Sequence, residues 1–374
     1  MNSKTVSSGF GQNIHVEISG GSHEPSVNAG VTGLPKGFAI DMEKLRAFTA
    51  LRAPGNSPWA TVRKEADEPV ITTGLEADGV TTDGSPLTIT IENTDARSAD
   101  YKRVKTVPRP GHADFTARMK YDKDGKYDGP CMAGGGPFSA RMTAPLCAAG
   151  GIALQMLEKR GVTIGAHLFS VGDIYDEPFD PSAVTGDELL ALSQSSFPVN
   201  DAAAGKKMQE HILALKEQGD SAGGIVEAAV TGLPAGIGGS MYGGVESVLS
   251  PILFGIPAVK GIEFGTGFAA SSLKGSENND PFIIKDGKVV TLTNHHGGIL
   301  GGITSGMPLV VRVAFKPTPS IALPQDSVDM EKMEPVKLSI QGRHDPCVVV
   351  RAVPAVYAAL ALGLLDMLTE GETE

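Results

Sequence analysis

The chain has 374 residues, of which 41% are hydrophobic and 20% are charged, and its formal net charge is −11 at pH 7. This length suits one large domain or two medium ones, and the composition is that of an ordinary globular protein. The acidic balance argues against non-specific binding to nucleic acid, so any anionic ligand must be held by a local basic cluster.

The cysteines and apolar segments bear on the compartment. Cys131, Cys147 and Cys347 have no CxxC spacing and cannot all pair, which favours a reduced, cytoplasmic environment. The N-terminus lacks a basic-then-apolar signal pattern. The longest apolar run, 352–365, is too short to span a bilayer and predicts a buried helix. No membrane partner is expected.

The spacing of apolar residues predicts the elements along the chain. From the N-terminus, we expect a strand over 12–18, a helix over 41–52, a strand over 87–92, a long basic loop over 97–126, a helix over 143–159, strands over 162–171 and 224–230 with a helix over 200–218 between them, a hairpin over 282–292 that turns at Asp286-Gly287, a strand over 309–315 and a last helix over 352–368. No change of composition marks a linker, so we expect one domain.

A short phrase occurs twice. Segment 20–37 ends in VTGLPKG and segment 219–236 ends in VTGLPAG, and His23 of the first aligns with Ala222 of the second. Chance recurrence of a common Gly-Leu-Pro turn is one interpretation. Internal duplication with pseudo-two-fold symmetry is the favoured one. We therefore expect the two segments to lie at equivalent places in two related halves, with only the first reaching the functional site.

Two motifs before the predicted helix at 143 could bind anions. RPGHADF places Arg109 and His112 in the densest basic segment, and arginine pairs bidentately with phosphate or carboxylate. GGGPFSAR offers glycines, Ser139 and Arg141 before a helix N-terminus, which favours anions, but it lacks the ending of a P-loop. A solvated basic loop and a plain glycine-rich turn are the alternative interpretations.

Two later motifs could also bind an anion or transfer a proton. AFKPTPS spaces Lys316, Thr318 and Ser320 by two, so one cation and two hydroxyls could face a phosphate. GRHDPC combines Arg343 with Asp345, which could be a base or a member of a structural ion pair. No cluster has metal-ligand spacing, so no metal is expected.

This ordered set of motifs resembles chorismate synthase almost from end to end. The motifs that carry the resemblance are GSH, RAPGNSPWATVRKEADEP, ENTDARSADY, RPGHADF, FSARMTA, IPAVKGIEFGTGF, GGILGGITSGMP, AFKPTPSI and GRHDPCVVVRAVP. The resemblance implies an α+β fold in which a single domain over 1–374 has a helical layer between two antiparallel sheets, with an internal pseudo-two-fold repeat. It also implies a homotetramer.

The resemblance further implies an activity. The family converts 5-enolpyruvylshikimate 3-phosphate to chorismate and phosphate by anti-1,4-elimination, a carbon–oxygen lyase reaction of the shikimate pathway to aromatic amino acids. The reaction needs reduced FMN although it is redox-neutral, and NADP is associated with the family. We expect a separate flavin reductase or a reduced-flavin pool to supply the cofactor.

The resemblance also assigns residues by position. His23 is similar to the histidine thought to protonate the leaving phosphate, His112 to the one placed against the reduced flavin, and Asp345 to the acid that helps remove the ring hydrogen. The expected substrate contacts are Arg52, Arg109, Arg141 and Arg343. The expected cofactor contacts are Ser139, Pro257, Ala258, Gly301, Lys316, Pro317, Thr318, Pro319, Ser320 and Arg343.

Some positions depart from the family pattern. GGSHE stands where GESHG is usual, so Glu24 is expected to interact with His23. Leu51, Ala53, Pro58 and Pro137 stand where arginine occurs in family members, and Tyr357 replaces a usual glutamate. A divergent paralogue that binds flavin or an anion without catalysis is the alternative. The joint presence of His23, His112 and Asp345 favours the enzyme.

Overall fold

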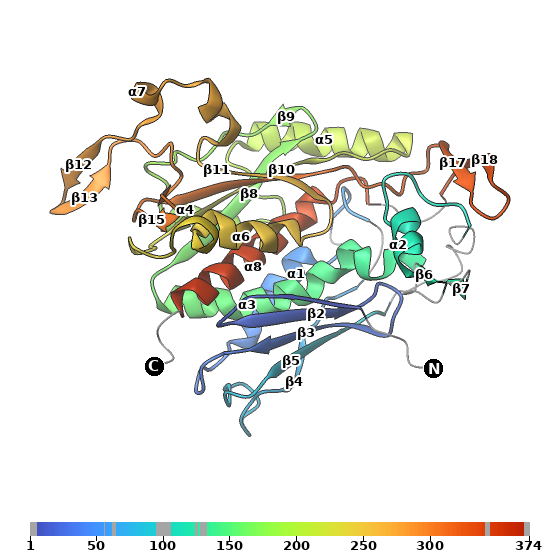
Figure 1. The fold of residues 1–374 in the computed structure, drawn as a ribbon, viewed down its shortest axis with the longest axis horizontal. Helices are drawn as coiled ribbons and strands as arrows, with labels where there is room; N and C mark the ends of the chain where they lie inside the picture. Colours follow the sequence, from blue (N-terminus) through green and yellow to red (C-terminus); the bar gives the residue numbers. More distant parts are fainter. Residues whose placement is uncertain are drawn as a thin grey trace.

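Two antiparallel sheets enclose a layer of helices in the computed structural model, which describes residues 6–55, 57–61, 65–94, 106–123, 126–127, 133–340 and 345–369 (Figure 1). The first sheet has the order β1-β2-β3-β5-β4, with strands Ser7–Phe10, His15–Gly20, Ser26–Thr32, Leu87–Glu92 and Val70–Thr73. The second has the order β11-β16-β10-β8-β9, with strands Val259–Phe264, Leu309–Phe315, Gly224–Thr231, Thr163–Val171 and Ile174–Tyr175. The α+β prediction is confirmed.

The helical layer holds the core. It contains α1 (Met42–Arg52), α3 (Thr143–Lys159), α6 (Val245–Phe254) and α8 (Val349–Leu368) (Figure 1). Helices α3 and α8 cross closely because Gly150 has no side chain: a Cβ there would lie 2.3 Å from the Cβ of Ala358. Helix α8 is apolar and long enough to cross a membrane, but 94% of its most apolar window is buried inside the protein, as in a core helix.

The last helix also binds a turn of the first sheet. Near the end of α8, the Asp366 carboxylate accepts hydrogen bonds from the backbone N–H groups of Gln12, Asn13 and Ile14 at 2.6–3.1 Å. These three residues form the turn between β1 and β2. The two ends of the chain are therefore joined through a buried carboxylate.

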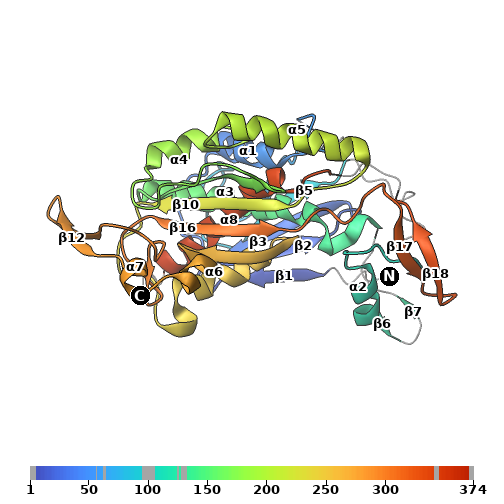
Figure 2. The same cartoon turned by 90° about the horizontal axis from the view of Figure 1, so that it is seen from above.

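The remaining elements surround this sandwich. Helices α4 (Gly186–Ser193) and α5 (Ala202–Gln218) lie along the β8–β9 side of the second sheet (Figure 2). Hairpins β12–β13 (Phe282–Lys285, Lys288–Thr291) and β17–β18 (Gln325–Asp329, Glu334–Leu338) project at opposite ends of the molecule (Figures 1 and 2). The short elements are α2 (Asp114–Tyr121), β6 (Asp122–Lys123), β7 (Lys126–Tyr127), η2 (Ala133–Phe138), η3 (Ala140–Met142), η4 (Met241–Gly243), η5 (Gly267–Ser272), α7 (Gly275–Asn278), β14 (Ile299–Leu300) and β15 (Ile303–Thr304).

Local signals in the sequence predicted most of the long elements. Strands β5 and β16 and the start of α3 lie where expected, and the β12–β13 hairpin turns at Asp286-Gly287 with φ angles of 51° and 74°. The loop expected over 97–126 is wrong for its described second half, because α2 forms there. Its acidic first turn and basic last turn suit the helix dipole. Residues 97–105 lie outside the described part of the chain.

The repeated turn follows equivalent strands. Gly33 and Gly232 come directly after β3 and β10, with φ angles of 85° and 82°. A Cβ on either would lie within 2.0 Å of a backbone oxygen, that of Asn13 or Gly161. Only glycine combines this φ with this close approach.

A threonine holds each repeated turn in the same way. Thr82 Oγ1 donates to the carbonyl of Pro35 at 2.6 Å, and Thr304 Oγ1 donates to that of Pro234 at 2.7 Å. Each hydroxyl also accepts a backbone N–H, from Phe38 or Ile237, three residues after the proline of its turn.

The correspondence extends to the sheets but not to the whole phrase. Strand order β2-β3-β5-β4 in one sheet matches β8-β10-β16-β11 in the other. Upstream the settings differ, because Gly20 ends a strand whereas Gly219 is the left-handed cap of α5.

Candidate active site

A cleft lies at one end of the helical layer, where the C-terminus of α1, the segment before α2, the η2–η3 turns, the loop after β16 and the start of α8 meet. Its walls are formed by Arg52, Thr61, Glu65, Arg109, His112, Phe138, Ser139, Ala140, Arg141, Pro257, Ala258, Lys316, Thr318, Pro319, Ser320, Asp345, Val348 and Arg351. Residues far apart in the sequence thus meet in one strongly basic site.

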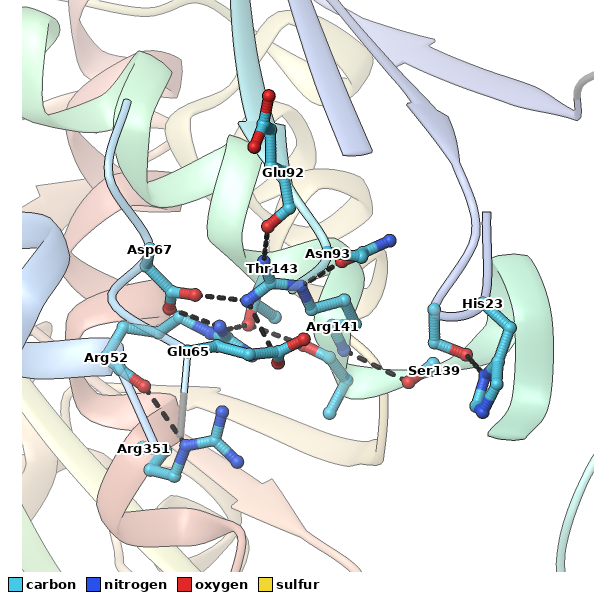
Figure 3. A network of polar contacts seen from close by, with 12 residues as sticks. His23, Arg52, Glu65, Asp67, Glu92, Asn93, Ser139, Arg141, Thr143 and Arg351 are labelled. Carbon is cyan, nitrogen blue, oxygen red and sulfur yellow. Dashed lines mark hydrogen bonds and ion pairs between the residues drawn. The ribbon is translucent and has the colours of Figure 1, made fainter. Parts of the chain in front are cut away.

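A buried carboxylate joins two of the expected arginines. Asp67 binds Nη1 of Arg52 with one oxygen and Nη1 of Arg141 with the other (Figure 3). Burial would raise the pKa of Asp67, but the guanidinium charges of Arg52 and Arg141 outweigh it and hold that pKa below its ordinary value. Glu65 Oε2 lies 3.4 Å from Arg141 Nη1. Asp67 and Glu65 were not predicted from the sequence.

Arg141 connects this cluster to the loop that carries His23. Its Nε donates to Asn93 Oδ1 at 2.7 Å (Figure 3). Asn93 Nδ2 in turn donates to the carbonyls of Gly21 and Glu24 at 3.0 and 2.7 Å. Arg141 lies on η3, where the Ser139 hydroxyl accepts its backbone N–H. Arg141 is therefore held at its backbone N–H by Ser139 and at its guanidinium by Asn93.

His23 lies beside the cleft but is not part of its wall. Ser22 Oγ is 3.2 Å from His23 Nδ1, and Ser22 N donates to the carbonyl of Gly136 in η2. A Cβ on Gly21 would be 3.4 Å from Glu24 Oε1. Glu24 thus places a carboxylate beside position 21, where the sequence departs from GESHG.

The segment before α2 forms a buried three-residue cluster. Asp114 accepts hydrogen bonds from Arg109 Nε and Nη2, both at 2.7 Å, and from Arg109 N at 2.9 Å. His112 Nδ1 lies 3.0 Å from Asp114 Oδ1. Burial lowers the pKa of His112, aided by Arg109 and Lys316 and opposed by Asp114. The hydrogen bonds from Arg109 and His112 outweigh burial and hold the pKa of Asp114 well below its usual range.

The loop after β16 brings a cation and hydroxyls to the opposite wall. Lys316 Nζ donates to the carbonyl of Gly111 at 2.5 Å, and Ser320 Oγ accepts from Arg109 Nη1 at 3.3 Å. Burial, with Lys260 nearby, lowers the pKa of Lys316. Thr318 Oγ1 is buried and has no hydrogen-bond partner among the residues that the structure describes. A ligand oxygen would satisfy it.

The start of α8 supplies a further ion pair. Asp345 Oδ2 accepts from Arg351 Nη1 at 2.9 Å, and Arg351 Nε donates to the carbonyl of Arg52 at 3.0 Å (Figure 3). Arg351 was not singled out from the sequence, although a lone arginine in the run VVVRAVP signals a polar position on an apolar helix.

Two of the expected cofactor contacts that the structure describes are not in the cleft wall, and a third cannot be placed. Gly301 lies in the β14–β15 turn, which precedes β16, whereas Lys316 follows it, so the two lie at opposite ends of that strand. Pro317 is exposed and outside the wall. Arg343 lies outside the described residues. The other expected contacts of the 258–320 region are in the wall.

The second copy of the repeat also approaches the cleft. Ser221 Oγ donates to the carbonyl of Thr318 at 2.8 Å, and Ala222 N donates to that of Pro346. The second copy therefore supports two cleft loops through hydrogen bonds to their backbones, although it carries no histidine.

The thiols of Cys147 and Cys347 and a second histidine cluster do not line the cleft. Burial raises the pKa of Cys147 and of Cys347 to about 12, which leaves both thiols protonated. His167 is fully buried. Its Nδ1 lies 2.6 Å from Asp176 Oδ2, and its Nε2 lies 2.9 Å from Glu227 Oε2. Burial lowers the pKa of His167, but the two carboxylates outweigh it and raise that pKa. Among the described residues, no group of three could hold a metal ion.

Comparison with known proteins gives the family. A family profile described as chorismate synthase matches residues 14–369. The curated chorismate synthase of Lancefieldella parvula is 45% identical over 379 residues, covering 99% of this chain and 98% of the relative. That of Thermococcus kodakarensis is 43% identical and covers 96% of each. A solved structure entitled "Crystal Structure of Chorismate Synthase" aligns with a TM-score of 0.74 at 25% identity, over 96% of this chain and 93% of that one.

The fold and cleft are those of an α+β enzyme with a basic site for small anionic molecules. The chain belongs to the chorismate synthase family, which makes it a carbon–oxygen lyase of aromatic amino acid biosynthesis.

Proposed function

We propose that the chain converts 5-enolpyruvylshikimate 3-phosphate to chorismate and phosphate in the cleft, with reduced FMN. The observation that carries this proposal is the meeting of Arg52, Arg109, Arg141, Lys316 and His112 in one wall. The substrate bears a phosphate and two carboxylates, and reduced FMN adds a phosphate and an anionic ring. Only a preorganised basic site stabilises so much like charge away from water.

The loop after β16 fits the phosphate of FMN. Lys316 contributes a cation, and Thr318 Oγ1 is a buried hydroxyl that lacks a partner among the described residues. Ser320 contributes a second hydroxyl that Arg109 already orients. When bound, the reduced flavin supplies electron density to the elimination. The role of the protein is to bind, orient and exclude water.

The arginines bind the substrate anions. In this structure Arg52 and Arg141 share the carboxylate of Asp67, which fixes their guanidinium planes at the inner wall of the cleft. Each guanidinium has five N–H donors in a rigid fork. Arg52 also donates to Thr143 and Ala140, and Arg141 also donates to Asn93 and Glu92, so only one or two donors on each remain for a ligand. Arg351 sits beside them on α8.

Three residues move protons in the proposed reaction. His23 delivers a proton to the departing phosphate, since an imidazole with a pKa near neutrality suits a general acid. His112 lies in the cleft wall and holds a proton against the reduced ring. Asp345, which Arg351 orients, helps to take the ring hydrogen. We also propose one domain of two related halves, a cytoplasmic homotetramer, and a separate source of reduced flavin.

An anaerobic assay tests the proposal. The protein is mixed with substrate and dithionite-reduced FMN, and chorismate absorbance is followed. We expect catalytic turnover that needs reduced FMN and leaves the flavin reduced. The matched pair of variants is His112→Ala in the cleft and His15→Ala at an exposed position of β2. The first should cut turnover and the second should leave it unchanged.

The outcomes separate the alternatives. Binding of FMN without turnover would indicate a non-catalytic paralogue. Flavin oxidised in proportion to product, or full activity with oxidised FMN alone, would contradict the proposed reaction.

A further inference from the structure

One carboxylate organises both expected functional groups of the RPGHAD segment. The Asp114 side chain is 2% exposed and contacts Arg109 through three nitrogens and His112 through one. Each of its two oxygens accepts two of these hydrogen bonds. Oδ2 accepts from Arg109 N and Nε, and Oδ1 accepts from Arg109 Nη2 and His112 Nδ1. Moving this carboxylate would therefore disturb both side chains.

The contacts define the tautomer of His112. An ionised carboxylate only accepts hydrogen bonds, so His112 Nδ1 must carry the proton that it donates to Asp114. Arg109 Nη2 lies 3.2 Å from the same Nδ1, but both are donors, and they converge on Oδ1 rather than bonding each other. In the neutral ring, Nε2 is then the nitrogen without a proton.

The opposite edge of the ring faces the glycine-rich η2 turn. A Cβ on Gly135 would lie 2.9 Å from His112 Nε2, so glycine at this position, with a φ of 108°, lets the ring lie where it does. His112 itself lines the cleft. Asp114 thus holds the imidazole at Nδ1. Its Nε2 lies against η2, on the side of the ring that Asp114 leaves free.

Asp114 also opposes the charges around the imidazole. Arg109 and Lys316 both disfavour a proton on His112, and burial does the same, whereas Asp114 favours it through a hydrogen bond and through its charge. Without this carboxylate, a protonated His112 would face two cations in a buried setting.

We propose that Asp114 is a positioning residue for the reaction: it fixes the Nδ1–H tautomer of His112, presents Nε2 at the cleft and holds Arg109 against Ser320. This inference rests on the proposed function, in which His112 serves the reduced flavin. Asp114 itself acts through its two partners. A merely structural role is the competing explanation, because Asp114 also opens α2.

The first test is made on the wild-type protein and needs no Asp114 variant. Nitrogen-15 NMR of histidine-labelled wild-type protein without flavin reports which ring nitrogen carries the proton, and His112→Gln identifies the signal. At a pH where His112 is neutral, we expect Nδ1 to be protonated and Nε2 bare. The Nε2–H tautomer would overturn the proposal, even if Asp114 variants fail to fold.

The second test compares two aspartates. Asp114→Asn keeps a helix-starting side chain but removes the charge, and Asp326→Asn removes a charge from an exposed ion pair with Lys337. For Asp114→Asn we expect a lower pKa of His112 and a 10- to 100-fold loss of affinity for reduced FMN, about the effect of one charged hydrogen bond. Oxidised FMN should be affected less. Asp326→Asn should change neither quantity.

The results distinguish this proposal from the function on which it rests. If the wild type makes no chorismate, the tautomer and pKa of His112 still test the role of Asp114. If the wild type is active but Asp114→Asn leaves the pKa of His112 and the preference for reduced FMN unchanged, the positioning role is refuted and the proposed function stands.

Discussion

Asp67→Asn should be strongly destabilising, because it removes the charge that lies between Arg52 and Arg141. The amide keeps one acceptor oxygen, but its NH₂ group would face the other guanidinium, so two donors would meet in a buried site. Both arginine side chains are 2% exposed, and water cannot readily replace the lost partner. Breaking a buried pair by removing one member costs about 3–5 kcal/mol, and we expect a loss of unfolding free energy in that range.

The neighbouring residue provides the control. Glu68 pairs with Arg46 at 2.6 Å, but both side chains are 54% exposed. Such a surface pair contributes about 0–1 kcal/mol, so Glu68→Gln should have little effect on stability. The two variants make the same chemical change at adjacent positions and differ in burial.

Urea unfolding at fixed protein concentration measures both variants, since concentration affects the midpoint of any oligomer. A pH series adds a second signature. The folded pKa of Asp67 is depressed, so its contribution to stability is present above its unfolded pKa and is lost as the pH falls through the folded value. Equal midpoints for Asp67→Asn and Glu68→Gln would refute the view that this carboxylate holds the arginines.

Two further results are expected. His23→Ala should slow turnover about 10²- to 10⁴-fold, the range for a lost general acid, with FMN affinity unchanged in a flavin titration; a matching loss of FMN affinity would place His23 on the cofactor instead. For His167, whose folded pKa is raised by Asp176 and Glu227, the stabilisation is complete below its unfolded pKa of about 6.5 and is lost as the pH rises through the higher folded value. The urea midpoint of the wild type should therefore fall on the alkaline side more steeply than that of His167→Gln, and parallel curves would contradict this reasoning.

The sequence predicted elements whose signals are local. Asp41 caps α1 through its side chain, and Gly161 follows the cationic end of α3, so both helices could be placed closely. Helix α6 was missed because Pro251 and flanking glycines resemble a loop, although Pro251 lies inside the helix. Helix α2 was missed because its basic residues suggested a solvated segment.

The cations of the site were predictable, but their carboxylate partners were not. Motifs identified Arg109, Arg141 and Lys316 because clusters of basic residues are rare in an acidic chain. Asp67 lies 74 residues from Arg141, and no spacing rule joins them. Pairing at such a distance depends on how the segment between α1 and β4 approaches η3, which only the folded chain defines. Gly301 shows the converse: a motif match did not guarantee a place in the cleft of this chain.

The position of α8 constrains the order in which the chain can fold during synthesis. This helix lies in the layer between the two sheets, and its Asp366 binds the turn between β1 and β2, yet it is synthesised after every strand of both sheets. Until then the inner face of the second sheet lacks α8, although α3 already packs on the first sheet, and contacts across almost the whole length of the chain must still close. The molecule therefore reaches its native state only after α8 has been synthesised, and a nascent chain that stalls before residue 349 exposes the inner face of the second sheet to aggregation.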